Sequence, residues 1–153
     1  MKQGLTSPSH VLTMLRTVGY KSAAYAISEL IDNSIDAEAQ NISIGISTKE
    51  VKVKKAVENI SAIGVFDDGY GMNFETLRNC VSIGWGTNLE NATGKLGKFG
   101  FGLKGAALAF CKRLEVYSWQ EGKPPLFTYL DFDERIKSES NELFDPIEKS
   151  PHD

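Results

Sequence analysis

The sequence predicts one α/β domain in which helices cover one face of a mixed sheet. A chain of 153 residues is long enough to bury a single core without help from disulfides or metals. Apolar residues recur at helical spacing in some segments and alternate as in strands in others. These segments follow one another as helices, strands, helix, glycine-rich loop, helix and strands, which is the order of a sheet with helices packed on it.

Two helices are expected at the N-terminal end of the chain. Apolar side chains at helical spacing predict a short amphipathic helix over residues 9–18, which ends near Gly19. A second helix is predicted directly afterwards, over residues 22–38.

Two strands and a capped helix are expected next. Residues 41–47 (NISIGIS) and 59–66 (NISAIGVF) alternate as half-buried strands, and the charged residues 48–58 are expected to connect them. The sequence DDGYGM then predicts a turn. Asn73 is expected to cap a helix whose apolar face contains Phe74, Leu77 and Val81.

The remaining segments are a loop, a helix, two strands and a tail. Residues 84–102 are too rich in glycine for a helix or strand interior and predict a mobile loop. A helix is expected to follow, with an apolar side formed by Leu103, Ala106, Ala107 and Phe110. Residues 113–119 and 126–132 predict a strand pair, and residues 134–153 read as a polar tail with little periodicity.

Composition narrows the classes of function. Hydrophobic and charged contents of 41% and 24% are those of a soluble globular protein. The net charge of −3 argues against a strong nonspecific grip on nucleic acid. Cys80 and Cys111 lie beside apolar residues, which favours buried thiols in a reducing compartment. A disulfide between them is the alternative. Neither a membrane span nor a signal peptide is evident, so an intracellular protein is expected.

The segment SELIDNSIDAEAQ is the first candidate for chemistry. On a helix, Glu29, Asn33 and Asp36 cluster on the side opposite the apolar residues, and Glu29 and Asn33 are neighbours one turn apart. A solvated helix face explains this pattern when it stands alone. A cation site beside a polyphosphate is the alternative.

The second candidate is DDGYGM, which follows an apolar strand. Its simplest explanation is a turn between a strand and a helix. In a functional interpretation, the Asp67 carboxylate accepts hydrogen bonds from an exocyclic amino group such as that of adenine. Gly69 and Gly71 then let the backbone close on a planar ring.

The third candidate is GKLGKFGFGLKGAA. Its glycines open a helix, and backbone N–H groups at a helix start suit phosphate oxygens. The literal dinucleotide fingerprint at Gly100, Gly102 and Gly105 is weak, because that motif must follow a strand. A P-loop is rejected, because Leu103-Lys104 stands where Lys-Ser or Lys-Thr is required.

Taken together, ELIDNSIDA, DDGYGM and GKFGFGLKGA resemble the three nucleotide-binding boxes of the GHKL superfamily of DNA gyrase, a heat-shock chaperone, histidine kinases and MutL. The NSIDA continuation is most similar to the MutL, gyrase and microrchidia branches. The resemblance implies a Bergerat-type two-layer α/β sandwich with a mostly antiparallel sheet. It also implies an ATPase that binds Mg-ATP under a flexible lid.

The resemblance assigns roles to residues by their motif positions. Glu29 would be the general base that orients water, and Asn33 would hold the Mg²⁺ that bridges the phosphates. Asp67 would read the adenine amino group, and Gly69 and Gly71 would shape the base pocket. The other residues expected to contact the nucleotide are Met72, Thr87, Gly97, Lys98, Phe99, Gly100, Gly102, Leu103 and Lys104. Asp36 is expected to be a supporting or structural group.

Several functions remain open at this point. The leading one is Mg-dependent ATP binding and slow hydrolysis by residues 1–133, with residues 134–153 as a polar tail or the start of a downstream segment. The resemblance implies an ATP-dependent homodimer in a longer protein, with nucleic acid bound only through other regions. Alternatives are the catalytic domain of a histidine kinase and a module that binds ATP without hydrolysing it. The expected location is the cytoplasm, or the nucleus in a eukaryote.

Overall fold

The computed structural model describes residues 23–52, 56–82, 110–138 and 144–151. The expected helix over residues 9–18, the glycine-rich loop and nearly all of the helix after it lie outside the described residues. The described elements, in chain order, are α2 (Ala23–Asp36), β1 (Ile42–Lys52), β2 (Ala56–Asp67), α3 (Phe74–Cys80), β3 (Arg113–Ser118), β4 (Leu126–Asp131), α5 (Phe132–Ser138) and β5 (Ile147–Glu148).

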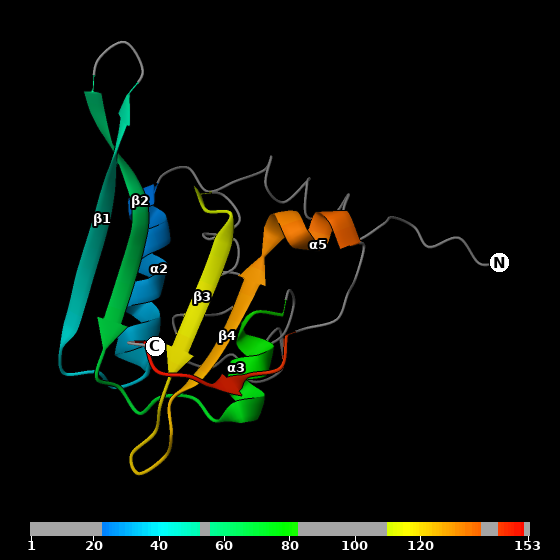
Figure 1. Cartoon of the computed structure of the whole chain (residues 1–153). Coiled ribbons are helices and arrows are strands. Elements are labelled where there is room, and N and C mark those ends of the chain that lie inside the picture. The colour runs from blue at the N-terminus through cyan, green and yellow to red at the C-terminus, as the bar shows by residue number, and fades with distance from the viewer. Residues whose placement is uncertain (1–22, 53–55, 83–109, 139–143, 152–153) are drawn as a thin grey trace.

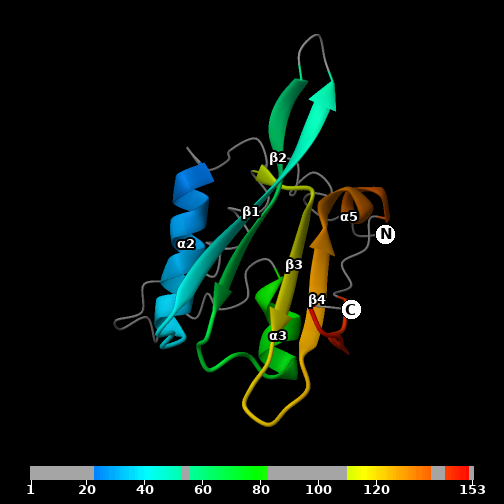
Figure 2. The same ribbon diagram turned by 60° about the vertical axis from the view of Figure 1, so that its left-hand side comes forward.

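The strands form two antiparallel sheets with helices packed on them. β1 pairs with β2 in one sheet, and the other sheet has the order β3-β4-β5. α2 packs against β2, while α3 and α5 pack against β4. In Figure 1, α2 and α3 lie behind the strands, and Figure 2 shows the same arrangement from the side. The expected α/β architecture is confirmed, since helices and antiparallel strands build the domain.

The β1–β2 hairpin is longer than the sequence predicted. Its register runs from Ile42 opposite Asp67 to Lys52 opposite Ala56, with one shift between Ser47 and Thr48. The expectation that residues 48–58 connect two shorter strands was therefore wrong for the described part of that segment. Charged side chains can project into solvent from both faces of a strand, so they do not exclude backbone pairing. The hairpin rises above the other elements in Figure 1.

The core lies between α3, β4 and α5. Val81, Leu130 and Phe132 form a buried cluster, and Leu77 of α3 is fully buried as well. The expected cap is confirmed, because the Asn73 Oδ1 accepts a hydrogen bond from the Thr76 N–H at 2.9 Å. The partly buried side chains packed against the cluster are Cys80, Cys111, Leu114, Val116 and Ile136.

The segment after β4 contains a short helix and a short strand where it is described, and the expected division of the chain after residue 133 stays a prediction. It begins with α5, whose first turn is capped by the Asp131 carboxylate through the Glu134 N–H at 3.0 Å. It ends with β5, which pairs with β4. The missing periodicity has a simple cause, because a helix of 7 residues and a strand of 2 residues are too short to show one.

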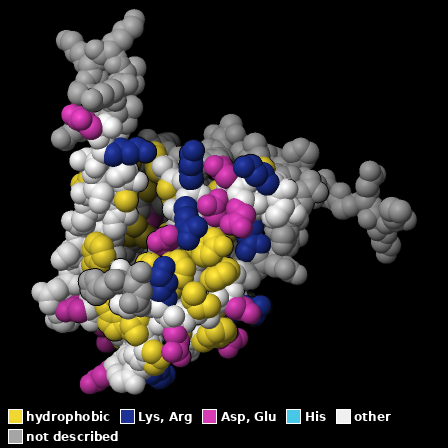
Figure 3. Space-filling view, viewed as in Figure 1, with side chains coloured by type: hydrophobic (Ala, Val, Ile, Leu, Met, Phe, Trp, Pro, Cys, Tyr) yellow, Lys and Arg dark blue, Asp and Glu magenta, His cyan; other side chains and the backbone are white. Residues whose placement is uncertain are grey.

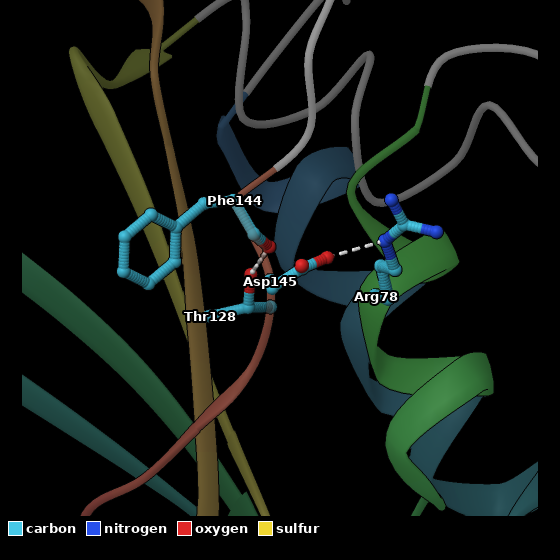
Figure 4. Close-up of polar contacts among 4 residues, drawn as sticks. All are labelled: Arg78, Thr128, Phe144 and Asp145. Atoms are coloured by element: carbon cyan, nitrogen blue, oxygen red, sulfur yellow. Dashed lines mark hydrogen bonds and ion pairs between the residues drawn. The ribbon is translucent and has the colours of Figure 1, made fainter.

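Two polar contacts fasten this segment to the domain (Figure 4). The Thr128 hydroxyl donates to the Phe144 carbonyl at 3.0 Å, and Arg78 of α3 pairs with Asp145 at 2.6 Å. Both partners of the ion pair are largely exposed, so the pair itself contributes at most about 1 kcal/mol. The ion pair still links α3 to the segment that precedes β5.

The outer face of β3 and β4 carries aromatic rings. Tyr117 and Phe127 are 4.6 Å apart between ring centroids, and Tyr129 and Phe144 are separated by the same distance. The Arg113 guanidinium lies 4.0 Å from the Tyr129 ring centroid, where a cation is attracted by the ring face. Figure 3 shows hydrophobic side chains gathered on this face between basic and acidic ones.

Candidate functional site

Asp67 is the last residue of β2, one residue beyond the predicted strand, and its carboxylate has two partners. The Gly69 N–H donates to the Asp67 Oδ1 at 2.9 Å, within the turn that follows the strand. The Ser34 hydroxyl donates to the Asp67 Oδ2 at 3.1 Å from α2. These two hydrogen bonds set the orientation of the Asp67 carboxylate. The carboxylate is exposed, so it remains accessible to a ligand.

Ser34 joins the strand end to the helix that carries the other candidates. Its side chain is buried, and its hydroxyl also lies 3.2 Å from the Leu30 carbonyl one turn earlier. Successive helical residues are rotated by about 100°, so the row of Glu29 and Asn33 lies about 100° around the helix from the row of Leu30 and Ser34 that reaches Asp67. Glu29 is half-buried and Asn33 is exposed. Ser34 therefore connects the helix that carries Glu29 and Asn33 to the Asp67 carboxylate, and this place, where α2 meets the end of β2, is called the corner.

α2 ends in a tight hydrogen-bonded turn next to this corner. The Glu38 N–H donates to the Ile35 carbonyl at 2.9 Å, and the Ala39 N–H donates to the Ser34 carbonyl at 3.1 Å. Glu38 itself has a φ of 60°, which is the left-handed conformation that commonly ends a helix and favours glycine. The turn directs the chain from α2 into β1 within a few residues.

Asp68 holds the residues between that turn and β1. Its Oδ1 accepts hydrogen bonds from the Gln40 N–H at 2.7 Å and the Asn41 N–H at 2.8 Å. Its Oδ2 accepts one from the Asn41 Nδ2 at 2.8 Å. The side-chain and backbone donors of Asn41, followed by the Gln40 N–H, lower the pKa of the Asp68 carboxyl, because they stabilise its charged form.

The two glycines of DDGYGM allow close approach on both sides of the turn. A Cβ at Gly69 would lie 2.6 Å from the Ala37 carbonyl oxygen, so no side chain fits there without a shift. Gly71 has a φ of 68°, and a Cβ on it would overlap the Trp119 carbonyl. Glycine is required at both positions because the turn packs against the end of α2 and the end of β3. The base-pocket role of both glycines stays a prediction.

Hydrogen bonds fix the second half of the turn as well. The Met72 N–H donates to the buried Ser118 hydroxyl at 2.7 Å, which attaches the start of α3 to the end of β3. The Tyr70 N–H donates to the Ala37 carbonyl at 3.0 Å. The Asp36 carbonyl accepts from the Tyr70 hydroxyl at 3.4 Å, so the contact of Asp36 with this turn is made by its backbone. Met72 is half-buried, and its contact with a nucleotide stays a prediction.

The side-chain oxygens on α2 are too few to hold a metal ion alone, but they suffice for one that also binds phosphate oxygens. Within the described ranges, no three His, Cys, Asp or Glu side chains are grouped as metal ligands. Mg²⁺ commonly takes just one or two protein oxygens beside phosphate oxygens and water. The exposed Asn33 side-chain carbonyl fits that requirement, and Glu29 one turn earlier adds negative charge beside it.

The predicted phosphate-binding residues cannot be placed against this corner. Thr87, Gly97, Lys98, Phe99, Gly100, Gly102, Leu103 and Lys104 all lie outside the described residues.

Sequence reasoning missed three residues that the structure places at the corner. Ser34 was placed on the apolar side of α2, and a polar residue in an otherwise apolar row was the signal that it has a buried partner. Asp68 was read only as part of a turn. Ser118 gave no signal, because its partner Met72 lies 46 residues away in the sequence.

Comparisons with known proteins identify the class and then the family. The fold is an α/β domain with antiparallel strands, helices on one side and a polar corner at the end of β2. The family model of histidine kinase-, DNA gyrase B- and HSP90-like ATPases matches residues 20–152. The chain belongs to this family, the GHKL ATPases, and ATP binding is the property that the family shares.

Two groups of relatives appear among the similar proteins. Protein MICRORCHIDIA 3 of Arabidopsis thaliana is 39% identical over 82 residues, which are 54% of this chain and 13% of that protein. Protein MICRORCHIDIA 2 of the same plant is 35% identical over 99 residues, 65% of this chain and 15% of that protein. DNA mismatch repair protein MutL of Methanocorpusculum labreanum is 43% identical over 53 residues, 35% of this chain and 8% of that protein.

The similarity to microrchidia proteins and MutL confirms the family expected from the three motifs. The chain matches less than a fifth of the length of these relatives. In the part of the chain that the structure describes, no helix combines the length and the hydropathy needed to cross a membrane.

Proposed function

We propose that this domain binds Mg-ATP and hydrolyses it slowly. The observation that carries the proposal is the contact between Ser34 of α2 and Asp67 at the end of β2. It joins the carboxylate proposed to read adenine to the helix that carries Glu29 and Asn33. Membership of an ATPase family supports the choice of nucleotide.

Adenine selectivity follows from the chemistry of Asp67. An ionised carboxylate only accepts hydrogen bonds, and adenine offers an exocyclic amino group as a donor. Guanine would place a carbonyl there, which opposes two acceptors and costs on the order of 1–3 kcal/mol for an unsatisfied polar group. The Ser34 hydroxyl and the Gly69 N–H hold the carboxylate without using all of its acceptor capacity.

Hydrolysis is assigned to the polar row of α2. Glu29 would accept a proton from water and orient that water toward the terminal phosphate, and the Asn33 carbonyl would hold the cation. Bound Mg²⁺ supplies charge neutralisation at the phosphates. No lysine or arginine occurs between Lys21 and Lys49, so Glu29 has no basic neighbour along the helix to neutralise it. Positioning and electrostatics carry most of phosphoryl transfer, so these two side chains are the expected minimum on the helix.

Calorimetry with ATP, ADP and GTP, with and without Mg²⁺, tests the binding half of the proposal. Tighter binding of ATP than of GTP, strengthened by Mg²⁺, is expected for the unmodified chain. Asp67→Asn should weaken ATP binding strongly, because it places an amide donor opposite the adenine amino group. Equal affinities for ATP and GTP would refute the assignment of Asp67.

Turnover measurements test the catalytic half. Glu29→Ala should still bind ATP while phosphate release falls by roughly 10²–10⁴-fold, since Glu29 acts on water. Asn33→Ala should instead lose the Mg²⁺-dependent part of the affinity. Phosphate release at the unmodified rate in Glu29→Ala would leave Glu29 as a solvated helix residue. Binding without any hydrolysis by the unmodified chain would select the non-hydrolysing module.

The proposed cycle includes a partner. We expect the glycine-rich loop to order over bound ATP, and the longer parent protein to form a homodimer when it does. Ordering a backbone costs about 1–2 kcal/mol per residue, so another protein surface would help the loop to close. Sedimentation of this chain and of a longer chain, each with a non-hydrolysable ATP analogue, should show a nucleotide-dependent dimer only for the longer one.

A further inference from the structure

We propose that Asp68 is a positioning residue for adenine recognition: it fixes the end of β2, and therefore the Asp67 carboxylate, against the end of α2. The inference rests on the proposed function and extends it to a residue that does not touch the nucleotide. Its evidence is a set of three hydrogen bonds that connect Asp68 to Gln40 and Asn41.

The position of Asp68 in the hairpin gives these bonds their effect. Ile42 and Asp67 are the last paired residues of β1 and β2. The next residues along each strand are Asn41 and Asp68, whose backbones are joined by a longer contact of 3.4 Å from the Asp68 N–H to the Asn41 carbonyl. Strand ends open easily when nothing follows the last pair. The Asp68 carboxylate closes this end by replacing weak backbone pairing with shorter side-chain contacts.

The same contacts reach α2 through a short hydrogen-bonded turn. Gln40 and Asn41 follow the turn in which the Ala39 N–H bonds to the Ser34 carbonyl. Ser34 also donates its hydroxyl to Asp67. A closed path therefore runs from Ser34 through the turn to Asn41, across to Asp68, and back through Asp67 to Ser34. The ring is closed by the Ser34 hydrogen bond to Asp67 and by the three hydrogen bonds of Asp68, and those of Asp68 use none of the acceptor capacity of the Asp67 carboxylate.

Loss of the Asp68 contacts should change binding in a particular way. The Asp67 carboxylate would sample more orientations, so the adenine amino group would find its acceptor less often. Affinity for ATP should fall, and so should the preference for ATP over purine riboside triphosphate, which lacks the 6-amino group. A residue that only stabilised the fold would leave this preference unchanged in the folded molecules.

A pair of substitutions isolates the hydrogen-bond pattern. Asp68→Asn keeps one oxygen, which can still accept from the Gln40 and Asn41 N–H groups. Its new amide nitrogen faces the Asn41 Nδ2, so two donors oppose each other where a hydrogen bond was made. Combining it with Asn41→Asp reverses the polarity of the side-chain contact, because the introduced amide can donate to the introduced carboxylate. The double variant has the same net charge as the unmodified chain.

Calorimetry with Mg²⁺ and each of the two nucleotides gives the result. Asp68→Asn should bind ATP on the order of tenfold more weakly, as expected for one lost charge-assisted contact, and with a smaller preference for the amino group. The double variant should recover both values. Asp131→Ala is the control, since it removes a carboxylate that caps α5 through the Glu134 N–H. It should leave both nucleotide affinities unchanged.

The outcomes separate this inference from the proposed function. If the unmodified chain binds no ATP, or does not prefer ATP over purine riboside triphosphate, the proposed function and this inference both fail. If it shows the preference and Asp68→Asn keeps the full affinity and preference, Asp68 is only a structural residue and the proposed function stands. Circular dichroism of each variant confirms that folded protein is compared.

Discussion

The two long hairpins of this domain are stabilised in different ways. In β3–β4, side chains are buried between the sheet and the helices, and Thr128 and Leu130 are 0% and 5% exposed. In β1–β2, large apolar side chains remain open, and Ile46 and Ile60 are 58% and 60% exposed. The first hairpin is therefore part of the core, whereas the second is joined to α2 mainly by polar contacts at one end.

The difference explains where a site can be built. A packed core tolerates few polar groups, because each needs a buried partner. The end of β1–β2 meets α2 through Ser34, Asp67, Asp68 and Asn41, which are all polar. The core hairpin supplies a fixed support, through the contact of Ser118 with the Met72 N–H, and the polar hairpin end presents the groups that can bind a ligand.

The largest expected effect is on the core side of this comparison. Phe132→Ala removes a fully buried ring from the cluster with Val81 and Leu130, which should lower the free energy of unfolding by about 3–5 kcal/mol. Ile46→Ala is the matched change in the other hairpin and should cost only about 0.2–1 kcal/mol, the value of a cross-strand pair with Ile63. Urea unfolding of both variants measures the difference. Similar losses would show that the β1–β2 hairpin is part of the same packed core.

The next effect is a loss of ATP affinity with almost no change in the stability of the fold. Ser34→Ala removes the hydroxyl that orients Asp67, so ATP affinity should fall by roughly five- to tenfold, equivalent to one hydrogen bond. Alanine favours helices more than serine by about 0.5 kcal/mol, which offsets the lost contact to Leu30, so thermal stability should hardly change.

Ser28→Ala is the matched control for that experiment. Ser28 lies on the same helix, and its hydroxyl donates to the Tyr25 carbonyl at 2.8 Å instead of to Asp67. It should bind ATP with unchanged affinity. An equal loss in both variants would mean that the helix as a whole, and not the contact of Ser34 with Asp67, determines the affinity.

Local signals in the sequence predicted most of the elements but not their connections. The helix over Ala23–Asp36, the end of a strand at Asp67 and the Asn73 cap follow from residues within one or two turns of each other. The long β1–β2 pairing was missed because charged residues on an exposed hairpin carry no alternation.

The corner itself depends on contacts between distant residues. The partners of Asp67 and Asp68 on the α2 side lie 33 and 27–28 residues away, and one sequence cannot identify such pairs. The three motifs indicated the family because each motif is local, even though the geometry that joins them is not. The assignment of Glu29 and Asn33 therefore stays a prediction that the variants above will decide.

A smaller and stabilising effect is expected at the end of α2. Glu38 has a left-handed conformation, which costs a residue with a side chain about 1 kcal/mol relative to glycine. Glu38→Gly should raise the free energy of unfolding by up to that amount, because the two backbone hydrogen bonds of the turn do not involve the side chain. Thermal unfolding checks the prediction. A loss of stability would mean that the Glu38 side chain has a structural role of its own.

The smallest expected effect is the acid sensitivity of the polar hairpin end, because the Asp68 carboxylate is exposed. Its pKa is lowered from its ordinary value of 3.8 by the Asn41 side chain, the Asn41 N–H and the Gln40 N–H. A carboxyl whose pKa is lower in the folded state contributes stability above the unfolded pKa and loses it as the pH falls through the folded pKa. The unmodified chain should therefore be more stable than Asp68→Asn by a constant margin above about pH 5, and the margin should shrink below pH 3.8. Urea unfolding of both proteins at a series of pH values measures the margin. A stability margin that grew toward acid pH would mean that the Asp68 carboxyl binds its proton more tightly in the folded state. The three hydrogen bonds from Gln40 and Asn41 could then not be what holds the end of β2 in place.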